Sequence, residues 1–327
     1  MSVSQRESND AIHPPLTTPD VFTDPTVFEP KLQHCQTFII LHGRGSFAAR
    51  FAPTLLATTT TENETIQSAF PHARLIFPTA SRNRATIYKR SYTHQWFDNW
   101  HLNEHTKRQE LMGKGLNKSC KYIHKLLSQE IELVGAENVV LWGLSQGCAT
   151  CLASLLAWDS KPFAAVVGMC GYLPFADVVQ DMASGGSCTE EEEENPFGSD
   201  DDDVFANSGD EGDRTSAELG NGQKVDGNVR DAIEYFREEI GMTEKRGMVY
   251  QEVPIYLGHG SEDKQVGIDF GRDTKEALMS IGAGVEMVEY PGLGHWYSAD
   301  MLTDIFSFLR KKLPAVAEKP MLIPVLE

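Results

Sequence analysis

The chain has 327 residues, of which 41% are hydrophobic and 9% aromatic, so it can build a sizeable core and wholesale disorder is excluded. Its net charge is −18, and twelve of its 47 acidic residues lie between Glu190 and Asp213 with no basic residue among them. The sequence offers no basic face for nucleic acid, no apolar run long enough to cross a membrane and no secretory signal at its start. Six cysteines without an export signal are typical of reduced thiols, so we expect a cytoplasmic protein, with the nucleus as an alternative.

The order of segments along the chain predicts one domain with two tails. Residues 1–33 are rich in Pro, Thr and Asp and show neither a helical nor a strand period, so we predict an extended tail that lies on the domain or leaves it. Residues 34–315 form the domain, and residues 316–327 form a C-terminal tail. Within the domain, residues 181–228 are acidic and almost free of large apolar residues, which predicts a disordered surface insert.

Buried strands alternate with helices along the domain. Nearly continuous apolar runs, typical of strands covered on both faces, occupy Thr37–Leu41, Arg74–Pro78, Asn138–Trp142, Ala164–Cys170, Pro254–Gly258 and Val285–Tyr290. Apolar residues recur with helical spacing at 116–134, 148–156 and 302–309. Strands that alternate with helices form crossover units, so the sequence predicts an α/β fold with a mostly parallel central sheet flanked by helices.

A serine motif lies at one strand-to-helix junction. Gly143-Leu144-Ser145-Gln146-Gly147 follows a predicted strand directly and opens a predicted helix. A serine on such a tight turn needs small residues on both sides, and the helix N-terminus then offers N–H groups to a developing oxyanion. A chance loop serine is the alternative for an isolated G-x-S-x-G motif, but the strand and the helix favour a nucleophile.

A base and an acid follow in the chain order that this type of turn requires. Glu262 and Asp263 come after one predicted strand, and either carboxylate is chemically able to orient a histidine. His295 comes after the next strand, between glycines and an aromatic residue. Both positions lie past the carboxyl ends of strands, where α/β sheets place their ligands. A glycine-rich turn after the first strand can supply a second oxyanion donor, the backbone N–H of Arg44, beside that of Gln146.

Together these motifs resemble the acyl-protein thioesterase, or phospholipase/carboxylesterase, branch of the α/β-hydrolases. The matching stretches are Phe38–Gly45, Trp96–Asp98, Gly143–Gly147, His259–Val266 and Gly292–His295. The resemblance covers residues 37–310 apart from the insert. It implies Ser145 as the nucleophile, His295 as the base and Asp263 as its partner. The N–H groups of Arg44 and Gln146 would form the oxyanion hole, while His42 is interpreted as structural.

The resemblance also implies an apolar channel for a fatty acyl chain. We expect Trp96, Phe97 and Leu144 to contact the substrate there, with simple core packing as the alternative for Trp96. The chain departs from the family pattern at Ser46, where an aspartate is usual, at Cys148, where a glycine is usual, and in the acidic insert. These departures leave the three triad positions intact and bear on the substrate.

Two remaining patterns favour a structural role. Cys148 and Cys151 form a C-x-x-C pattern within a predicted helix, which indicates small residues facing the sheet. His101 and His105 have helical metal-ligand spacing, but no third ligand is evident. We therefore predict neither a metal nor a cofactor.

The sequence thus predicts a serine hydrolase of acyl thioesters or esters, and the resemblance implies above all an acyl-protein thioesterase that removes fatty acyl groups from protein cysteines. The alternatives are a small-ester carboxylesterase or lysophospholipase and, in another class, a catalytically inactive hydrolase-fold binding protein. The expected partners are an acylated protein, a lipid or a small ester, without nucleic acid or stable membrane insertion. The acidic insert could contact basic segments of a substrate protein transiently, or serve only as a solvated tether.

Overall fold

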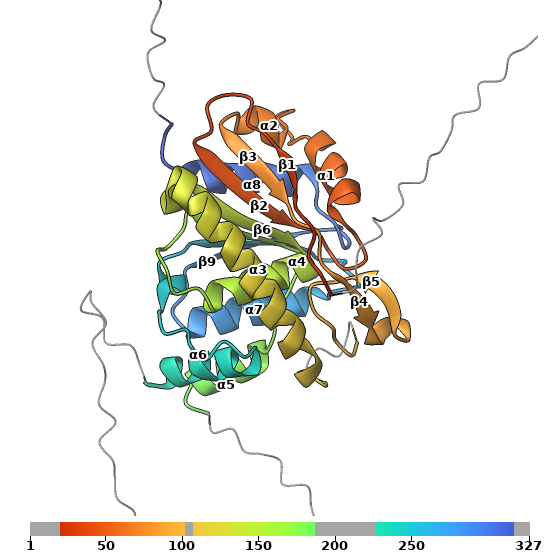
Figure 1. Cartoon of the computed structure of the whole chain (residues 1–327), viewed down its shortest axis with the longest axis vertical. Coiled ribbons are helices and arrows are strands. Elements are labelled where there is room, and N and C mark those ends of the chain that lie inside the picture. Colours follow the sequence, from red (N-terminus) through yellow and green to blue (C-terminus); the bar gives the residue numbers. More distant parts are fainter. Residues whose placement is uncertain (1–19, 102–106, 187–226, 317–327) are drawn as a thin grey trace, which may run out of the picture.

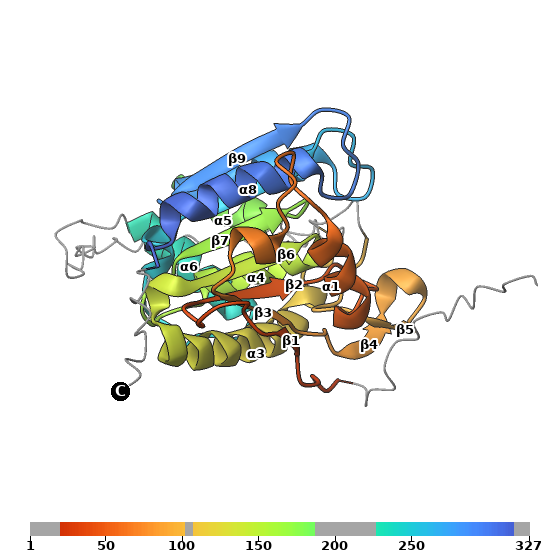
Figure 2. The same cartoon turned by 90° about the horizontal axis from the view of Figure 1, so that it is seen from above.

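The computed structural model describes residues 20–101, 107–186 and 227–316. Its centre is a seven-stranded sheet in the order β1-β3-β2-β6-β7-β8-β9, in which only the edge strand β1 runs antiparallel to its neighbour (Figures 1 and 2). The strands are β1 (Thr26–Phe28), β2 (Gln36–Leu41), β3 (Ala73–Phe77), β6 (Val139–Leu144), β7 (Ala165–Met169), β8 (Ile255–Gly260) and β9 (Val285–Tyr290). The expected mostly parallel sheet is confirmed.

Eight helices accompany the sheet in the described part of the chain. They are α1 (Ala48–Ala57), α2 (Ile66–Ala69), α3 (Glu110–Val134), α4 (Gln146–Leu156), α5 (Ala176–Ala183), α6 (Gly227–Glu239), α7 (Ile268–Ser280) and α8 (Ala299–Lys312). A separate antiparallel hairpin consists of β4 (Arg82–Ala85) and β5 (Ser91–His94), joined through a single helical turn at Thr86–Tyr88. Among the described helices, none has the length and apolarity needed to span a bilayer.

The two faces of the sheet carry separate cores because side chains alternate along each strand. Phe38 and Ile40 of β2 face a cluster that includes Phe51 of α1 and Phe306 of α8. Ile39 and Leu41, two residues apart on β2, face the opposite cluster, to which α3, α4, α6 and α7 contribute. Figure 1 shows α3 crossing this second face. Coverage on both sides explains why the predicted strands are continuous apolar runs.

The segment before the first predicted strand contributes to the domain. Thr26–Phe28 form β1 and pair with β3, so the expectation of a tail without a strand is wrong for these residues. Phe22 also packs on the domain, with its ring 4.2 Å from that of Tyr122 in α3. A strand of three residues is too short to show a period, and Pro25 and Pro30 on either side obscure it further.

The predicted acidic insert has helical ends. Residues 181–183 belong to α5, and residues 227 and 228 open α6, so the boundaries at 181 and 228 are too wide. Residues 187–226 lie outside the described residues, and disorder there stays a prediction.

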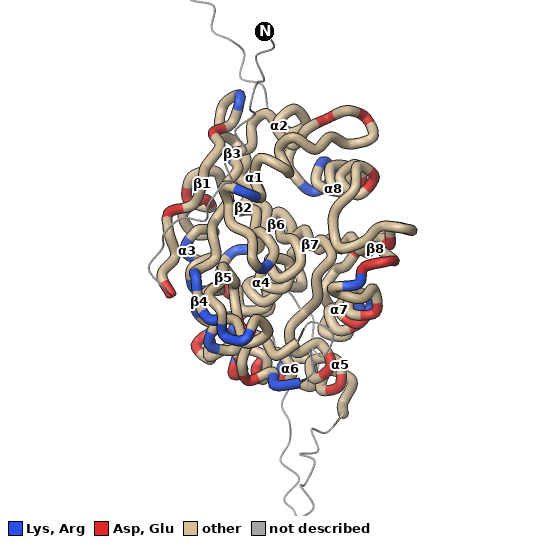
Figure 3. Tube along the Cα trace, turned by 90° about the vertical axis from the view of Figure 1, so that its right-hand side faces the viewer, with Lys and Arg blue, Asp and Glu red and all other residues tan. Residues whose placement is uncertain are grey.

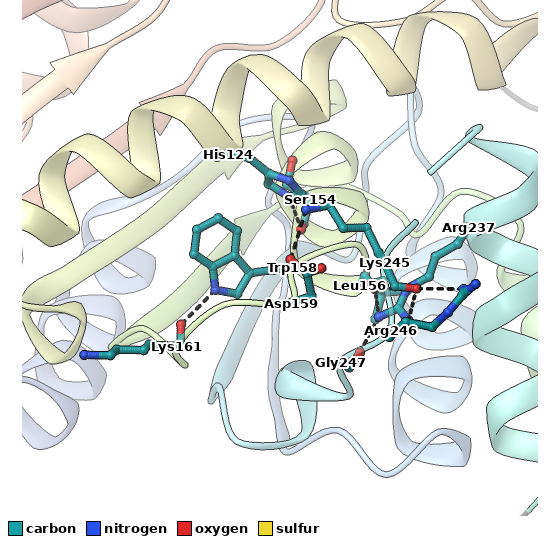
Figure 4. A network of polar contacts seen from close by, with 10 residues as sticks. All are labelled: His124, Ser154, Leu156, Trp158, Asp159, Lys161, Arg237, Lys245, Arg246 and Gly247. Atoms are coloured by element: carbon teal, nitrogen blue, oxygen red, sulfur yellow. Dashed lines mark hydrogen bonds and ion pairs between the residues drawn. The ribbon is translucent and has the colours of Figure 1, made fainter. Parts of the chain in front are cut away.

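Arg237 connects α6 to the C-terminal end of α4. Its buried guanidinium donates to Leu156 O from Nε at 3.1 Å and from Nη2 at 2.9 Å, and also to the carbonyl oxygens of Lys245 and Gly247 (Figure 4). Leu156 ends α4, where carbonyl groups lack partners within the helix. In addition, His124 Nε2 donates to Ser154 O at 2.8 Å. The helix that follows Ser145 is thus fixed at its far end by α6 and α3.

Candidate active site

Four loops meet at the carboxyl edge of the sheet. The turn containing Arg44 follows β2, Ser145 follows β6, Asp263 follows β8 and His295 follows β9. Because all four strands are parallel, their ends lie on one edge, and side chains more than 200 residues apart in the sequence can meet there.

Ser145 lies on a strained turn between β6 and α4. Its φ of 56° and ψ of −121° are unusual for a residue with a side chain. A Cβ on Gly143 would approach the Gly147 carbonyl carbon to 2.3 Å, and one on Gly147 would approach Leu41 O to 2.5 Å. These contacts leave no room for a side chain at either glycine. The predicted requirement for small residues around the serine is therefore confirmed.

Ser145, His295 and Asp263 form a continuous chain of hydrogen bonds. His295 Nδ1 lies 2.6 Å from Asp263 Oδ2, and His295 Nε2 lies 2.9 Å from Ser145 Oγ. An ionised carboxylate can only accept, so Nδ1 carries the proton and Nε2 is left to accept from the serine hydroxyl. This arrangement prepares Nε2 to take a proton from Ser145.

The two candidate acids lie in different environments. The Asp263 side chain is fully buried at 0% exposure, and its Oδ1 accepts from the backbone N–H groups of Gln265 at 2.8 Å and Val266 at 2.9 Å. Glu262 is exposed. The geometry thus brings Asp263, and not Glu262, to His295.

A second histidine supports this carboxylate. Buried His259 donates from Nε2 to Val266 O at 2.8 Å, and the same nitrogen lies 3.5 Å from Asp263 Oδ2. Burial by itself raises the pKa of Asp263, but hydrogen bonds from His259, His295 and the Val266 amide outweigh it and hold the pKa well below its usual range. Asp263 is therefore charged across the neutral pH range. No role was predicted for His259 from the sequence, where it is only the first residue of the matching stretch His259–Val266.

The turn after β2 lies directly against the serine. A Cβ on Gly43 would be 3.4 Å from Ser145 Cβ. The amides of Gly45 and Ser46 donate within the fold, to His94 O at 2.8 Å and Gly43 O at 3.2 Å. Gln146 is the first residue of α4, where an amide has no partner within the helix. The turn after β2 and the start of α4 thus both adjoin Ser145, and the assignment of the Arg44 and Gln146 amides to an oxyanion hole stays a prediction.

His42 is structural, in line with the sequence interpretation. It is buried at 0% exposure, its Nδ1 donates to Gly43 O at 2.7 Å and its Nε2 accepts from Ala80 N at 3.0 Å. Burial lowers the pKa of His42 to about 4, so the ring is neutral near pH 7. It fixes the conformation of the glycine-rich turn.

Trp96 and Phe97 lie behind the serine motif. Both are buried, and their backbone holds the Gln146 side chain: Trp96 N donates to Oε1 at 3.0 Å, and Nε2 donates to Phe97 O at 2.7 Å. Trp96 Nε1 also donates to His42 O at 2.8 Å. Neither residue lines the cavity beside Ser145, and their expected contact with the substrate stays a prediction. A sequence motif does not show whether its aromatic side chains point into a cavity or into the core.

A cavity of about 390 Å³ opens beside Ser145 and His295. Leu144 lines it, as expected from the sequence. The other lining residues are Gly43, Arg44, Gly45, Ser46, Arg50, Phe51, Thr54, Tyr88, Gln265, Val266 and Trp296. Arg50, Phe51 and Thr54 of α1, together with Tyr88, were not predicted, because they lie outside the motif stretches.

Asp98 explains how Tyr88 reaches this cavity. Its Oδ1 accepts from Thr86 N at 2.9 Å and its Oδ2 from Thr86 Oγ1 at 2.5 Å. These bonds tie the helical turn at the tip of the β4–β5 hairpin to the Trp-Phe-Asp segment. Asp98 therefore positions the part of the hairpin that borders the cavity.

The unusual cysteine after the serine motif fits a space left by two glycines. A Cβ on Gly168 or Gly171 would lie 2.5 Å from Cys148 Sγ. Cys148 and Cys151 are both buried and free, which confirms the prediction of small residues packed in the helix. Of the predicted helical histidine pair, His105 lies outside the described residues, and no group of three candidate metal ligands occurs within them.

Comparison with known proteins identifies the class and then the family. The arrangement of sheet and helices is that of an α/β-hydrolase: the structure of SOBER1 from Arabidopsis thaliana matches with a TM-score of 0.56 at 21% identity, covering 85% of this chain and 98% of that one. Acyl-protein thioesterase 2 from Zea mays matches with a TM-score of 0.56 at 19% identity, covering 89% and 99%. The model of the phospholipase/carboxylesterase family matches residues 22–192 and 239–313. The chain belongs to this family.

Curated relatives agree with this assignment. Acyl-protein thioesterase 1 of Gibberella zeae is 24% identical over 300 residues, which cover 89% of this chain and 96% of the relative. Carboxylesterase SOBER1 of Arabidopsis thaliana is 25% identical over 285 residues, covering 85% and 91%. Residues 193–238, which the family model leaves unmatched, include most of the acidic residues between Glu190 and Asp213 and all of α6 but its last residue. The contact of Arg237 with α4 is therefore made by a part of this chain that the match to the family model does not cover.

Proposed function

We propose that this protein is a serine hydrolase that cleaves acyl thioesters and esters, and that its main reaction removes fatty acyl groups from protein cysteines. The observation that carries the proposal is the hydrogen-bonded chain from Asp263 through His295 to Ser145 on the strained turn. Membership of the phospholipase/carboxylesterase family and the thioesterase and carboxylesterase names of the relatives support the same reaction class.

The proposed mechanism assigns one role to each group. His295 Nε2 takes the proton of Ser145 as Oγ attacks the acyl carbonyl, and Asp263 stabilises the imidazolium that forms. The amides of Arg44 and Gln146 hold the oxyanion of the tetrahedral intermediate. As the intermediate collapses, His295 protonates the leaving thiolate or alkoxide and Ser145 keeps the acyl group. Water, activated by His295, then attacks the acyl-enzyme and releases the acid.

Two features support an acyl substrate of moderate size. The cavity borders Ser145 and is lined in part by Phe51, Leu144, Val266 and Trp296, which offer apolar contact to an acyl chain. A small-ester carboxylesterase or a lysophospholipase uses the same groups and remains the alternative within this reaction class. A catalytically inactive binding protein is the alternative from another class, and the short Ser145–His295 distance argues against it.

Labelling and turnover test the proposal together. A fluorophosphonate probe is expected to label the wild-type protein and not Ser145→Ala. On short p-nitrophenyl esters Ser145→Ala should lose nearly all turnover, keeping only the residual catalysis of the oxyanion hole, about 10³-fold over water. Equal turnover by the two proteins would contradict the assignment. A chain-length series of matched acyl thioesters and oxygen esters then distinguishes a thioesterase from a carboxylesterase.

Location and protein partners extend the proposal. The five described cysteines are free thiols, which is consistent with a reducing compartment such as the cytoplasm. The twelve acids between residues 190 and 213 would attract Lys/Arg-rich segments of a substrate protein, chiefly by raising the association rate. Deletion of residues 187–226 should then slow hydrolysis of a basic acyl-peptide at low salt and leave a small neutral ester unaffected. Equal rates with and without the segment would make it a passive tether.

A further inference from the structure

The side chain of Arg44 has hydrogen-bonding capacity that the fold does not use. Arg44 lines the cavity beside Ser145, and its Nη2 donates to Asn99 Oδ1. Its Nε and Nη1 are buried and have no hydrogen-bond partner in the described part of the chain. Buried guanidinium donors are normally paired, because an unpaired donor loses its contact with water and gains nothing in return.

The positive charge of Arg44 also lacks a dedicated counterion. Asn99, its partner, is neutral, and the nearby carboxylate of Asp98 already accepts from Thr86 and from the Asn99 amide. Burial lowers the pKa of the Arg44 guanidinium, although Tyr172, Tyr88 and Asp98 partly oppose this effect. A buried cation held mainly by a neutral amide is costly, and an anion that enters the cavity would remove that cost.

The charged side chains that line the cavity carry positive charge. Arg44 and Arg50 both border it, and none of the described residues that line it is an aspartate or a glutamate. Ser46, Thr54 and Tyr88 add hydroxyl groups that can donate to an anion. The two arginines thus give the cavity lining a positive charge, although Asp263 is charged behind His295 and the whole chain has a net charge of −18.

We propose that the preferred substrate of this site is an ester or thioester with a negatively charged group close to the scissile bond, and that the guanidinium of Arg44 binds this group. The proposal rests on the proposed function, because it takes Ser145 as the nucleophile, and it adds the chemical class of the substrate. The charged group is a carboxylate or phosphate on either the acyl chain or the leaving group. A charge-assisted hydrogen bond in a buried position is strong enough to select such a substrate over its neutral analogue.

Matched pairs of substrates test the proposal on the wild-type protein. For the acyl side the pair is p-nitrophenyl hemiglutarate and p-nitrophenyl pentanoate, and for the leaving group it is S-acetyl-3-mercaptopropionate and its amide. Rates without enzyme are subtracted, since the free carboxylate speeds spontaneous hydrolysis. We expect kcat/KM for the charged member to exceed that of the neutral member about tenfold or more in one pair, which also identifies the side that carries the charge. Ratios near one in both pairs would overturn the proposal.

Variants assign the preference to Arg44. The ratio of charged to neutral kcat/KM should fall to about one in Arg44→Met, whatever the general loss of activity through the adjacent oxyanion turn. It should keep its wild-type value in Arg90→Met, a control that removes an exposed arginine outside the cavity lining. If Arg50→Met abolishes the preference and Arg44→Met does not, the assignment to Arg44 is wrong. Since Arg44→Met could fail to fold, ligand binding to Ser145→Ala is a second measurement. The ligands are glutarate and pentanamide if the acyl pair shows the preference, or 3-mercaptopropionate and its amide if the leaving-group pair does, and equal affinity within the relevant pair would contradict the proposal.

The failure of the substrate class is distinguishable from failure of the proposed function. Hydrolysis of the neutral esters with labelling of Ser145, but without a preference for charge, overturns the substrate class alone. Absence of both hydrolysis and labelling overturns the function as well.

Discussion

At the scale of single residues, burial separates two adjacent carboxylates that are chemically equivalent. Asp263 is enclosed by backbone amides and contacts His295, while Glu262 faces solvent. A buried carboxylate that accepts several hydrogen bonds is fixed in position and keeps its charge, so it can hold the imidazole in one tautomer. An exposed carboxylate one residue away does neither.

This difference predicts opposite results for two conservative substitutions. Asp263→Asn should lower kcat about 10⁴-fold, because an amide in place of the carboxylate favours the wrong tautomer of His295. Glu262→Gln should leave kcat close to that of the wild type. Steady-state kinetics on a p-nitrophenyl ester measure both, with circular dichroism as a check on folding. A large loss in Glu262→Gln together with a small loss in Asp263→Asn would transfer the role to Glu262.

The sequence could locate residues whose position follows from the backbone. It could not show in which direction a side chain points. Ser145 and His295 were placed at the correct edge because strand ends and chain order constrain them. Trp96 and Phe97 were assigned to the substrate channel, yet they are buried behind Gln146. The environment of the Arg44 guanidinium could not be predicted from the sequence either, since it depends on contacts with Asn99 and with the β4–β5 hairpin.

At the scale of elements, the turn between β6 and α4 is held by close backbone packing. Gly143 lies against the backbone of Gly147, which in turn lies against Leu41 O at the end of β2. The serine amide donates to Met169 O of β7 at 2.8 Å. Three strands therefore determine the conformation of one residue, and its unfavourable φ persists because the surroundings fix it.

A methyl group at Gly143 should disturb this packing. A Cβ there would lie 2.3 Å from the Gly147 carbonyl carbon, so β6 and α4 must separate. We expect Gly143→Ala to lower the free energy of unfolding by about 3 kcal/mol and to reduce kcat about 100-fold through displacement of Ser145. Gly284→Ala is the control, because a Cβ there meets nothing within 4 Å, and it should change stability by less than about 0.5 kcal/mol. Urea unfolding compares the two, and equal stabilities would refute the packing argument.

Elements were predictable where their apolar pattern was visible in the sequence. The six strands inferred from apolar runs correspond to β2, β3, β6, β7, β8 and β9. The inner strands among them are mainly apolar because both of their faces are covered. β1 was missed because it has three residues at an edge. The β4–β5 hairpin was missed because its sequence is mostly polar and basic, and such strands give no hydrophobic pattern.

At the scale of the whole molecule, basic and acidic residues are concentrated in different regions. Basic residues gather on the β4–β5 hairpin, including Arg82, Arg84, Lys89 and Arg90, while acidic residues gather on α5 and α7 and after β8 (Figure 3). The net charge was readable from the composition, but this separation was not, because it depends on how the elements pack. The positive region adjoins the cavity through Tyr88, which follows β4 in the hairpin.

Two buried neutral histidines couple the stability of the whole domain to pH. Burial lowers the pKa of His42 and of His124 to about 4, against about 6.5 in the unfolded chain. Between these values the unfolded state binds protons that the folded state does not. The free energy of unfolding is therefore highest above pH 6.5 and falls as the pH decreases, by up to about 1.4 kcal/mol per pH unit for each histidine. Asp263 adds to the loss only below about pH 4, where its carboxylate would be protonated in the unfolded chain.

Urea unfolding at pH 7.5, 6.0, 5.0 and 4.5 measures this dependence, and His124→Gln isolates one contribution. Glutamine cannot titrate but can still donate to Ser154 O, the acceptor of His124 Nε2. The variant should be somewhat less stable than the wild type at pH 7.5, because the ring also packs on Trp158 with centroids 5.1 Å apart. Its stability should decline less steeply between pH 6.0 and 4.5, by about the slope of one histidine. Parallel curves for the two proteins would mean that His124 is protonated in the folded state or exposed to solvent, and the acid sensitivity would then have another origin.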